Sequence, residues 1–179
     1  MTLTFTIPVA ALADVLPTPA EFAQAAGRGV SNKVKRHLVD RDAQSGRADG
    51  MPRTGYYGDA ANSVTTEVVA SRATVTIHKE GVALHYYGGV VYPTAGHKAL
   101  AIPKSPATAG KRPAEFDPSH EKLALVWPKG SSTGTLRDKK SGDVFYLLVA
   151  HANIPADESV IPEETALGEA AIAAMESII

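Results

Sequence analysis

The sequence contains no cysteine among its 179 residues. This absence excludes disulfides, thiolate metal sites and cysteine nucleophiles, and it fits a reducing compartment. Long hydrophobic runs are also missing, since no stretch approaches the roughly 18 apolar residues that a membrane span requires. The first 22 residues lack a basic segment and place Pro8 and Asp14 within their apolar stretch, so they make a poor signal peptide. We therefore expect a soluble protein.

Sequence signatures of catalysis are absent as well. There is no G-x-S-x-G elbow, no phosphate-binding glycine loop and no H-E-x-x-H pair. Five of the six histidines are dispersed over the central and C-terminal parts of the chain: His78, His85, His97, His120 and His151. Polar strand faces and loops explain such histidines more simply than ligand roles do. We expect no enzyme activity, catalytic residue, cofactor or metal, and an enzyme with a dispersed histidine site is the alternative.

Charge is distributed unevenly, although the formal net charge is only -1. Residues 28–53 contain seven Lys or Arg and three Asp, whereas residues 153–179 contain six acids and no Lys or Arg. Such asymmetry can indicate a nucleic-acid face. It also suits an assembly in which the basic face of one subunit meets the acidic face of the next.

A long helix is predicted near the N-terminus. Thr18 is a suitable N-cap, Pro19 suits the first helical position, and Glu21 can complete a capping box. We expect this helix to run towards Asp42, with Val30, Val34 and Leu38 as its apolar stripe. Gly27 and Gly29 should weaken it near the middle.

Two further helices are predicted. A short one is expected within residues 53–64, with Thr54 as its cap. The other covers the C-terminus, starts at Pro162 and has acids in its first turn. Its apolar stripe is Leu167, Ala171, Ala174, Met175 and Ile178.

Strand patterns fill the centre of the chain. Residues 73–77 alternate between apolar and polar side chains, and shorter strands are expected in GVVYP, KALAIP, KLALVWP and VFYLLVAHANIP. Residues 104–122 and 128–143 show no periodicity and are interpreted as long loops. We expect residues 104–118 and 131–143 to be poorly ordered in the isolated subunit and to become ordered against neighbouring proteins after assembly. We expect one α+β domain over 1–179, an antiparallel sheet packed by the N-terminal and C-terminal helices, with long loops.

The stretch HYYGGVVYP combines aromatics with paired glycines. We expect a strand to lead into it, the glycines to bend the backbone, and VVYP to return as an edge strand. Tyrosines suit contacts that are partly apolar and partly wet, which makes this stretch a candidate interface, composed of His85, Tyr86, Tyr87, Gly88 and Gly89. Three basic residues of the long helix are candidates for facing DNA, with a solvated helix surface as the simpler alternative: Lys33, Lys35 and Arg36.

The order of these segments resembles the phage virion morphogenesis, or tail-completion, proteins. VSNKVKRHLVDRDA is similar to the family's basic helix, and PRTGYYGDAANSV to the segment that follows it. ATVTI, HYYGGVVYP, HKALAIP and VFYLLVAHANIPA are similar to its strands and glycine motif. The resemblance extends from Val30 to Ala156. Asp157 and Glu158 depart from it, since the family has Arg-Pro there.

This resemblance implies a structural protein of a tailed phage, built into the neck of the virion and assembled in the host cytoplasm. It implies a homo-oligomeric ring, expected to be a hexamer, that joins the head connector or adaptor to the tail tube or tail terminator. DNA in the channel is a further expected partner, and no membrane is. A tail terminator or minor tail protein is one alternative, and a non-specific DNA-binding module is another.

Overall fold

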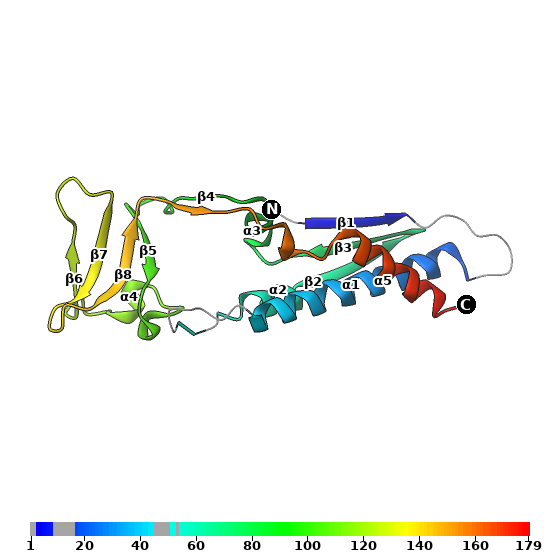
Figure 1. Ribbon diagram of the computed structural model, residues 1–179, viewed down its shortest axis with the longest axis horizontal. Coiled ribbons are helices and arrows are strands. Elements are labelled where there is room, and N and C mark those ends of the chain that lie inside the picture. The colour runs from blue at the N-terminus through cyan, green and yellow to red at the C-terminus, as the bar shows by residue number, and fades with distance from the viewer. Residues whose placement is uncertain (1–2, 9–16, 45–50, 53) are drawn as a thin grey trace. The chain divides into compact units, whose positions relative to one another are not determined.

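The computed structural model describes residues 3–8, 17–44, 51–52 and 54–179, and the prediction about the signal peptide falls mostly outside them. The chain divides into two compact units, coloured along the chain in Figure 1. Unit 1 comprises residues 1–44, 55–88 and 155–179, and unit 2 comprises residues 45–54 and 89–154. The prediction of one domain over 1–179 did not include this division. The α+β class, with its antiparallel sheets, is confirmed.

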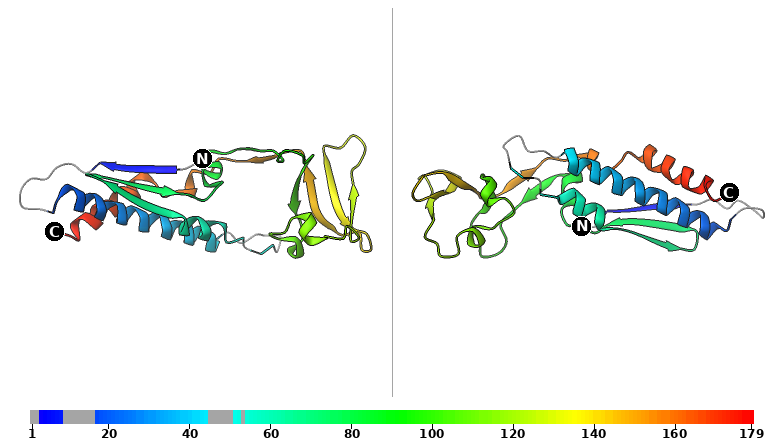
Figure 2. Two further views of the ribbon diagram at one scale, coloured as in Figure 1. Left: turned by 180° about the vertical axis from the view of Figure 1, so that it is seen from behind. Right: turned by 90° about the horizontal axis from the view of Figure 1, so that it is seen from below.

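Unit 1 is a three-stranded sheet with helices packed against it. Its antiparallel strands follow the order β1-β3-β2. Both α1 and α5 pack in this unit, as the sequence predicted, and α5 lies alongside α1 in Figures 1 and 2. The elements are β1 Leu3–Pro8, α1 Pro19–Gln44, α2 Tyr56–Asn62, β2 Val64–Val69, β3 Arg72–Ile77, α3 Val82–Tyr87, the 3-10 turn η2 Glu158–Val160, and α5 Glu164–Glu176.

Helix α1 begins with the predicted capping box. The backbone N–H of Thr18 donates to the Glu21 carboxylate at 2.7 Å, and the N–H of Glu21 donates to the Thr18 hydroxyl at 3.3 Å. Hydrogen bonds from Thr18 hold the pKa of Glu21 below its usual value. The short helix α2 is confirmed too, but its cap is Gly55, in a left-handed conformation, rather than Thr54.

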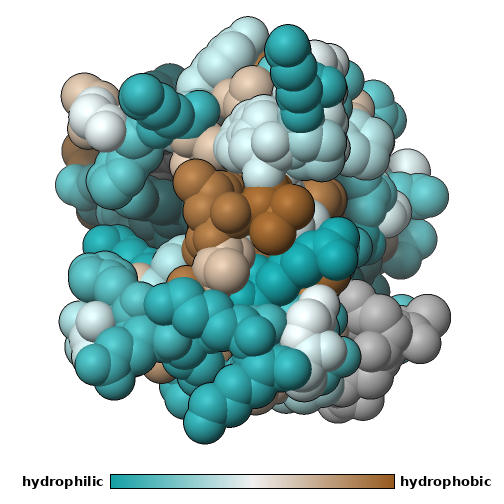
Figure 3. Space-filling model, turned by 90° about the vertical axis from the view of Figure 1, so that its left-hand side faces the viewer, coloured by the Kyte–Doolittle hydropathy of each residue, from teal (hydrophilic) through white to brown (hydrophobic). Residues whose placement is uncertain are grey.

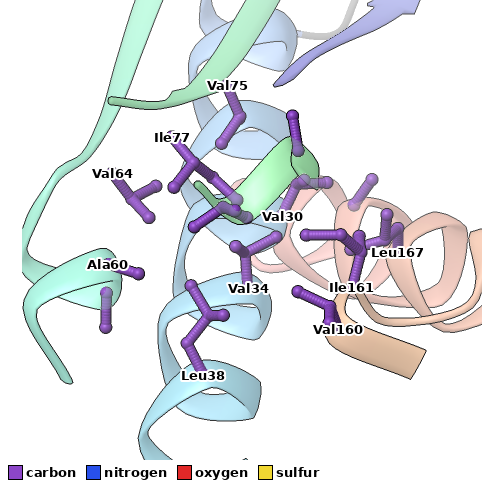
Figure 4. Close-up of a cluster of buried hydrophobic side chains, with 14 of the residues drawn as sticks. Val30, Val34, Leu38, Ala60, Val64, Val75, Ile77, Val160, Ile161 and Leu167 are labelled. Atoms are coloured by element: carbon purple, nitrogen blue, oxygen red, sulfur yellow. The ribbon is translucent and has the colours of Figure 1, made fainter. Parts of the chain in front are cut away.

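The core of unit 1 forms where α1 meets the sheet and α5 (Figure 4). The predicted stripe of Val30, Val34 and Leu38 is fully buried. It meets Val75 and Ile77 of β3 on one side and residues of η2 and α5 on the other. Truncating a buried leucine to alanine typically costs about 2–5 kcal/mol, so this stripe contributes substantially to the stability of unit 1.

Two glycines of α1 allow its neighbours to approach closely. A Cβ at Gly29 would lie 2.2 Å from the carbonyl oxygen of Ala170 and 2.7 Å from the Cβ of Ala174, both in α5. A Cβ at Gly27 would lie 2.8 Å from side-chain atoms of Ala73 and Thr66. The sequence predicted that these glycines weaken the helix. They also make its packing possible.

Unit 2 is built on a four-stranded antiparallel sheet of order β5-β8-β7-β6, with β4 and β9 paired separately. Its elements are β4 Gly89–Val91, β5 Leu100–Pro103, the 3-10 turn η1 Pro106–Thr108, α4 Pro113–Phe116, β6 Leu123–Val126, β7 Thr133–Asp138, β8 Val144–Val149 and β9 Ala152–Ile154.

The two segments predicted as long loops contain regular structure, so that prediction is wrong in part. Residues 128–143 include β7, which pairs with both β6 and β8. Residues 104–122 include η1 and α4, and Thr108 there is fully buried. The prediction missed β7 because its sequence, TGTLRD, carries only one large apolar residue. The expectation that both segments become ordered against neighbouring proteins stays a prediction.

Asp117 organises the turn between α4 and β6. Its carboxylate is buried and accepts backbone N–H groups of Glu121, Lys122 and Leu123 at 2.8–3.2 Å. Burial acts to raise the pKa of Asp117, but these three donors outweigh it and hold the pKa below its usual value. A polar segment without hydrophobic periodicity is thereby held in one conformation.

We expect Gly29→Ala to destabilise unit 1, although alanine favours an exposed helix interior by about 1 kcal/mol over glycine. The added methyl group would force α5 away from α1. The matched control is Gly168→Ala in α5, because no atom lies within 4 Å of a Cβ at that position. Urea unfolding should show a lower midpoint for Gly29→Ala and an unchanged or higher one for Gly168→Ala. Equal effects of both would contradict the close-packing explanation.

Candidate functional site

The candidate interface residues His85, Tyr86 and Tyr87 lie on a short helix, α3, so the predicted strand is wrong here. Val82 and Ala83 are buried, and Tyr86 packs against the same core. This spacing has the period of a helix rather than that of a strand. The helix starts after Gly81 and ends at Gly88, whose positive φ values of 88° and 72° turn the chain at both ends.

The paired glycines separate the two units. The boundary falls between Gly88 and Gly89, and β4 begins at Gly89 opposite Ile154. Gly88 has φ 72° and ψ 173°, a conformation that is open essentially to glycine alone. The two glycines therefore have a backbone role, and the predicted bend at this position is present.

His85 belongs to a cluster of three rings. Its ring centroid lies 5.3 Å from that of Tyr56 and 6.1 Å from that of Tyr57, while the two tyrosines meet edge to face at 5.2 Å. The backbone carbonyl of His85 also accepts the N–H of Asp157 at 2.9 Å. The cluster joins α2 and α3 to the segment before η2, and His85 acts in it as a packing group.

Tyr56 is held as a neutral hydrogen-bond donor. Its hydroxyl donates to the carbonyl oxygen of Glu80 at 2.8 Å. Burial, together with the neighbouring Tyr57, raises the pKa of Tyr56 to about 12. A phenol with so high a pKa is a poor general base near neutral pH.

Arg41, near the end of α1, is the polar centre of this region. Its guanidinium forms an ion pair with Asp157 and donates to the carbonyl and hydroxyl oxygens of Ser159 at 3.1 and 2.9 Å. It also lies 5.2 Å from the centroid of the Tyr57 ring. His37, one turn earlier, contacts the same Ser159 carbonyl at 2.8 Å. These contacts attach η2 to α1.

The side chains described in this region make packing and hydrogen-bond contacts. Among the residues that the structure describes, no three histidine, aspartate or glutamate side chains form a group suited to a metal ion. Tyr87 is 58 % exposed and meets Tyr86 edge to face at 4.8 Å. Of the three side chains in the candidate interface, Tyr87 is therefore the most available to a partner, and the interface role of this stretch stays a prediction.

The basic candidates Lys33, Lys35 and Arg36 are exposed on α1. Lys35 also borders a groove between α1 and β2, which is lined by Gln24, Arg28, Ser31, Asn32, Lys35, Thr66 and Val68. This surface can accept an anionic partner. None of the described helices is long and apolar enough to cross a membrane.

Two exposed apolar surfaces were not predicted. Leu125, Val126 and Trp127 are 64, 40 and 42 % exposed at the edge strand β6. Ile172 of α5 and Ile179 just beyond it are 53 and 74 % exposed. Sequence reasoning identified the strand-like KLALVWP and the C-terminal helix, but strand order and the outer face of a helix depend on tertiary packing.

Comparisons with protein-family models, with curated proteins and with solved structures found no match to this chain.

We expect the Arg41–Asp157 contact to make stability depend on pH. Hydrogen bonds from Ser159, and the Arg41 charge, hold the pKa of Asp157 below its usual value, although burial opposes them. Because the folded pKa is depressed, this contribution is present above the unfolded pKa of about 4 and is lost as the pH falls through the folded pKa.

The thermal unfolding midpoint of Asp157→Asn should therefore be lower than that of the wild type at neutral pH. Between about pH 5 and about pH 3, the midpoint of Asp157→Asn should fall less than the wild-type midpoint does. Glu158→Gln, an exposed neighbour, serves as the control and should follow the wild-type curve. Parallel curves for the wild type and Asp157→Asn would show that this carboxylate does not carry the effect.

Proposed function

We propose that this chain is a structural, non-enzymatic virion protein of a tailed phage, acting in the neck as a tail-completion protein. The observation that carries this proposal is the ordered resemblance between Val30 and Ala156. Its segments correspond to α1, α2, β3, the turn from α3 into β4, then β5, β8 and β9. An order of this kind over most of the chain is more specific than any one of its motifs.

The proposed assembly is a homo-oligomeric ring, expected to be a hexamer. Its neighbours are the head connector or adaptor on one side and the tail tube or tail terminator on the other. Exposed apolar side chains on β6 and α5 support an assembling protein, because large exposed apolar groups that gather on one surface often mark protein contacts. The separation of basic and acidic segments supports contacts between unlike surfaces of successive copies.

The basic face of α1 gives this role a second partner. Lys33, Lys35 and Arg36 are exposed and can contact the phosphates of DNA in the channel. The same face favours the alternative of a free DNA-binding module. A filter-binding titration separates the two, because a module binds duplex DNA as an isolated subunit with a steep dependence on salt.

The proposed function predicts that the chain is a component of purified particles. Mass spectrometry of virions should detect it, and a phage that lacks its gene should accumulate full heads and finished tails that do not join. Complementation with the wild-type gene should restore joined particles. Joined, infectious particles without the protein would refute the proposal.

The position of the protein in the particle distinguishes the related alternatives. Electron microscopy of labelled particles should place the protein between head and tail. A position at the end of isolated tails would favour a tail terminator, and a position at the distal tip would favour a minor tail protein.

A further inference from the structure

The edge strand β6 carries an unusual apolar surface. Leu125 and Val126 are the last two residues of the strand, and Trp127 follows them. In the described part of the chain β6 pairs with β7 alone, so its outer edge is open. Proteins normally protect such edges with charge, proline or a bulge. Because successive side chains of a strand point to opposite faces, Leu125 and Trp127 share one face and Val126 lies on the other. We call Leu125 and Trp127 the β6 patch.

The hairpin holds this patch in place. The Trp127 ring lies directly over Gly134 of β7, where an added Cβ would be 2.2 Å from Cε3, and its Nε1 donates to the carbonyl of Ser131 at 3.0 Å. Leu125 pairs with Leu136 across the strands. The patch is thus a fixed feature of the hairpin, and a partner that covers it need not order it first.

The surroundings of the β6 patch carry more basic than acidic residues. Figure 3, seen from the side on which β6 and β7 are drawn, shows a hydrophobic centre surrounded by hydrophilic surface. Three acids in this stretch, Glu121, Asp138 and Asp143, are outnumbered by five exposed basic residues on β7, its turn and the ends of β6: Lys122, Lys129, Arg137, Lys139 and Lys140. Lys122 is held with its Nζ 4.3 Å from the centroid of the Phe116 ring. A partner that fits here has an apolar centre and an acidic margin.

The outer face of α5 has this composition. Leu167 and Ala171 face the core, whereas Ile172 is exposed on α5 and Ile179 is exposed three residues beyond the end of the helix. Glu169 and Glu176 are exposed at i−3 and i+4 from Ile172, the spacings that place residues on one helix face. Residues 155–179 contain six acids and no Lys or Arg. We call Glu169, Ile172 and Glu176 the α5 face.

We propose that the β6 patch of one copy binds the α5 face of the next copy, which gives the head-to-tail contact of an assembly of identical chains. The inference rests on the proposed function for the closure of that assembly into a ring. The two surfaces are complementary, because apolar side chains meet apolar side chains and the lysines meet the glutamates. Contacts between two unlike surfaces generate rings when the rotation closes and filaments when it does not.

Two variants test the contact, each altering one surface. Leu125→Glu places a negative charge in the β6 patch, and Ile172→Glu places one in the α5 face. Both positions are more than half exposed, so the subunit should remain folded, which circular dichroism checks. Each variant alone should lose the larger species in light scattering, with self-association weakened by about tenfold or more. Val69→Glu, 64 % exposed on β2, is the matched control and should assemble like the wild type.

Mixing the two variants gives the decisive result. The Leu125→Glu chain retains its α5 face and the Ile172→Glu chain retains its β6 patch, so one intact contact remains between them. The two altered surfaces repel one another because both gain a negative charge. We expect heterodimers and no larger species from the mixture. Higher salt should weaken wild-type assembly, because the margins of the contact are charged.

Three outcomes would overturn the inference. They are wild-type assembly by either folded variant, a mixture that stays monomeric, and a wild-type chain that is monomeric at the highest attainable concentration. These outcomes are separate from the test of the proposed function. A protein that is absent from particles but forms heterodimers on mixing refutes the neck role alone, whereas a virion component whose variants assemble normally refutes this contact alone.

Discussion

The close approach of α5 to α1 at Gly29 is the constraint on which unit 1 depends. No side chain larger than hydrogen fits between this position and the Ala170 carbonyl. A helix interior normally disfavours glycine by about 1 kcal/mol relative to alanine, so its presence here requires compensation. The compensation is the burial of the Val30, Val34 and Leu38 stripe, together with Leu167 and Ala171, around that contact.

Polar contacts of Arg41, near the end of α1, add to this packing. Arg41 attaches η2 through Asp157 and Ser159, and it also lies against Tyr57 of α2. The ring cluster of Tyr56, Tyr57 and His85 then connects α2 to α3. Arg41 and His37 thus hold together segments that are more than a hundred residues apart in the sequence.

How much of this could be predicted depends on the range of the interactions. The capping box at Thr18, the stripe on α1 and the alternation in β3 are local patterns, and the structure contains all three. The strand predicted at α3 was wrong because aromatics followed by paired glycines occur at the end of a strand as well as in a short helix between two glycines. Strand β7 was missed because its pairing with β6 and β8, rather than its own composition, makes it a strand.

The candidate surfaces lay beyond sequence reasoning for a related reason. The strand KLALVWP was predicted correctly, but only the order β5-β8-β7-β6 makes it an edge. Its exposed apolar residues therefore could not be told from core residues in the sequence.

Helix α5 packs one face against α1 and exposes an apolar side chain on another. Its inner face needs small residues, since α1 approaches so closely at Gly29, and Ala170, Ala171 and Ala174 meet that need. Ile172 is not part of that face and is more than half exposed. Ile172 instead lies between the exposed Glu169 and Glu176 on the outer side, so one helix combines a buried small-residue face with an outer face that is acidic around one apolar side chain. The proposed contact between copies would cover that outer face.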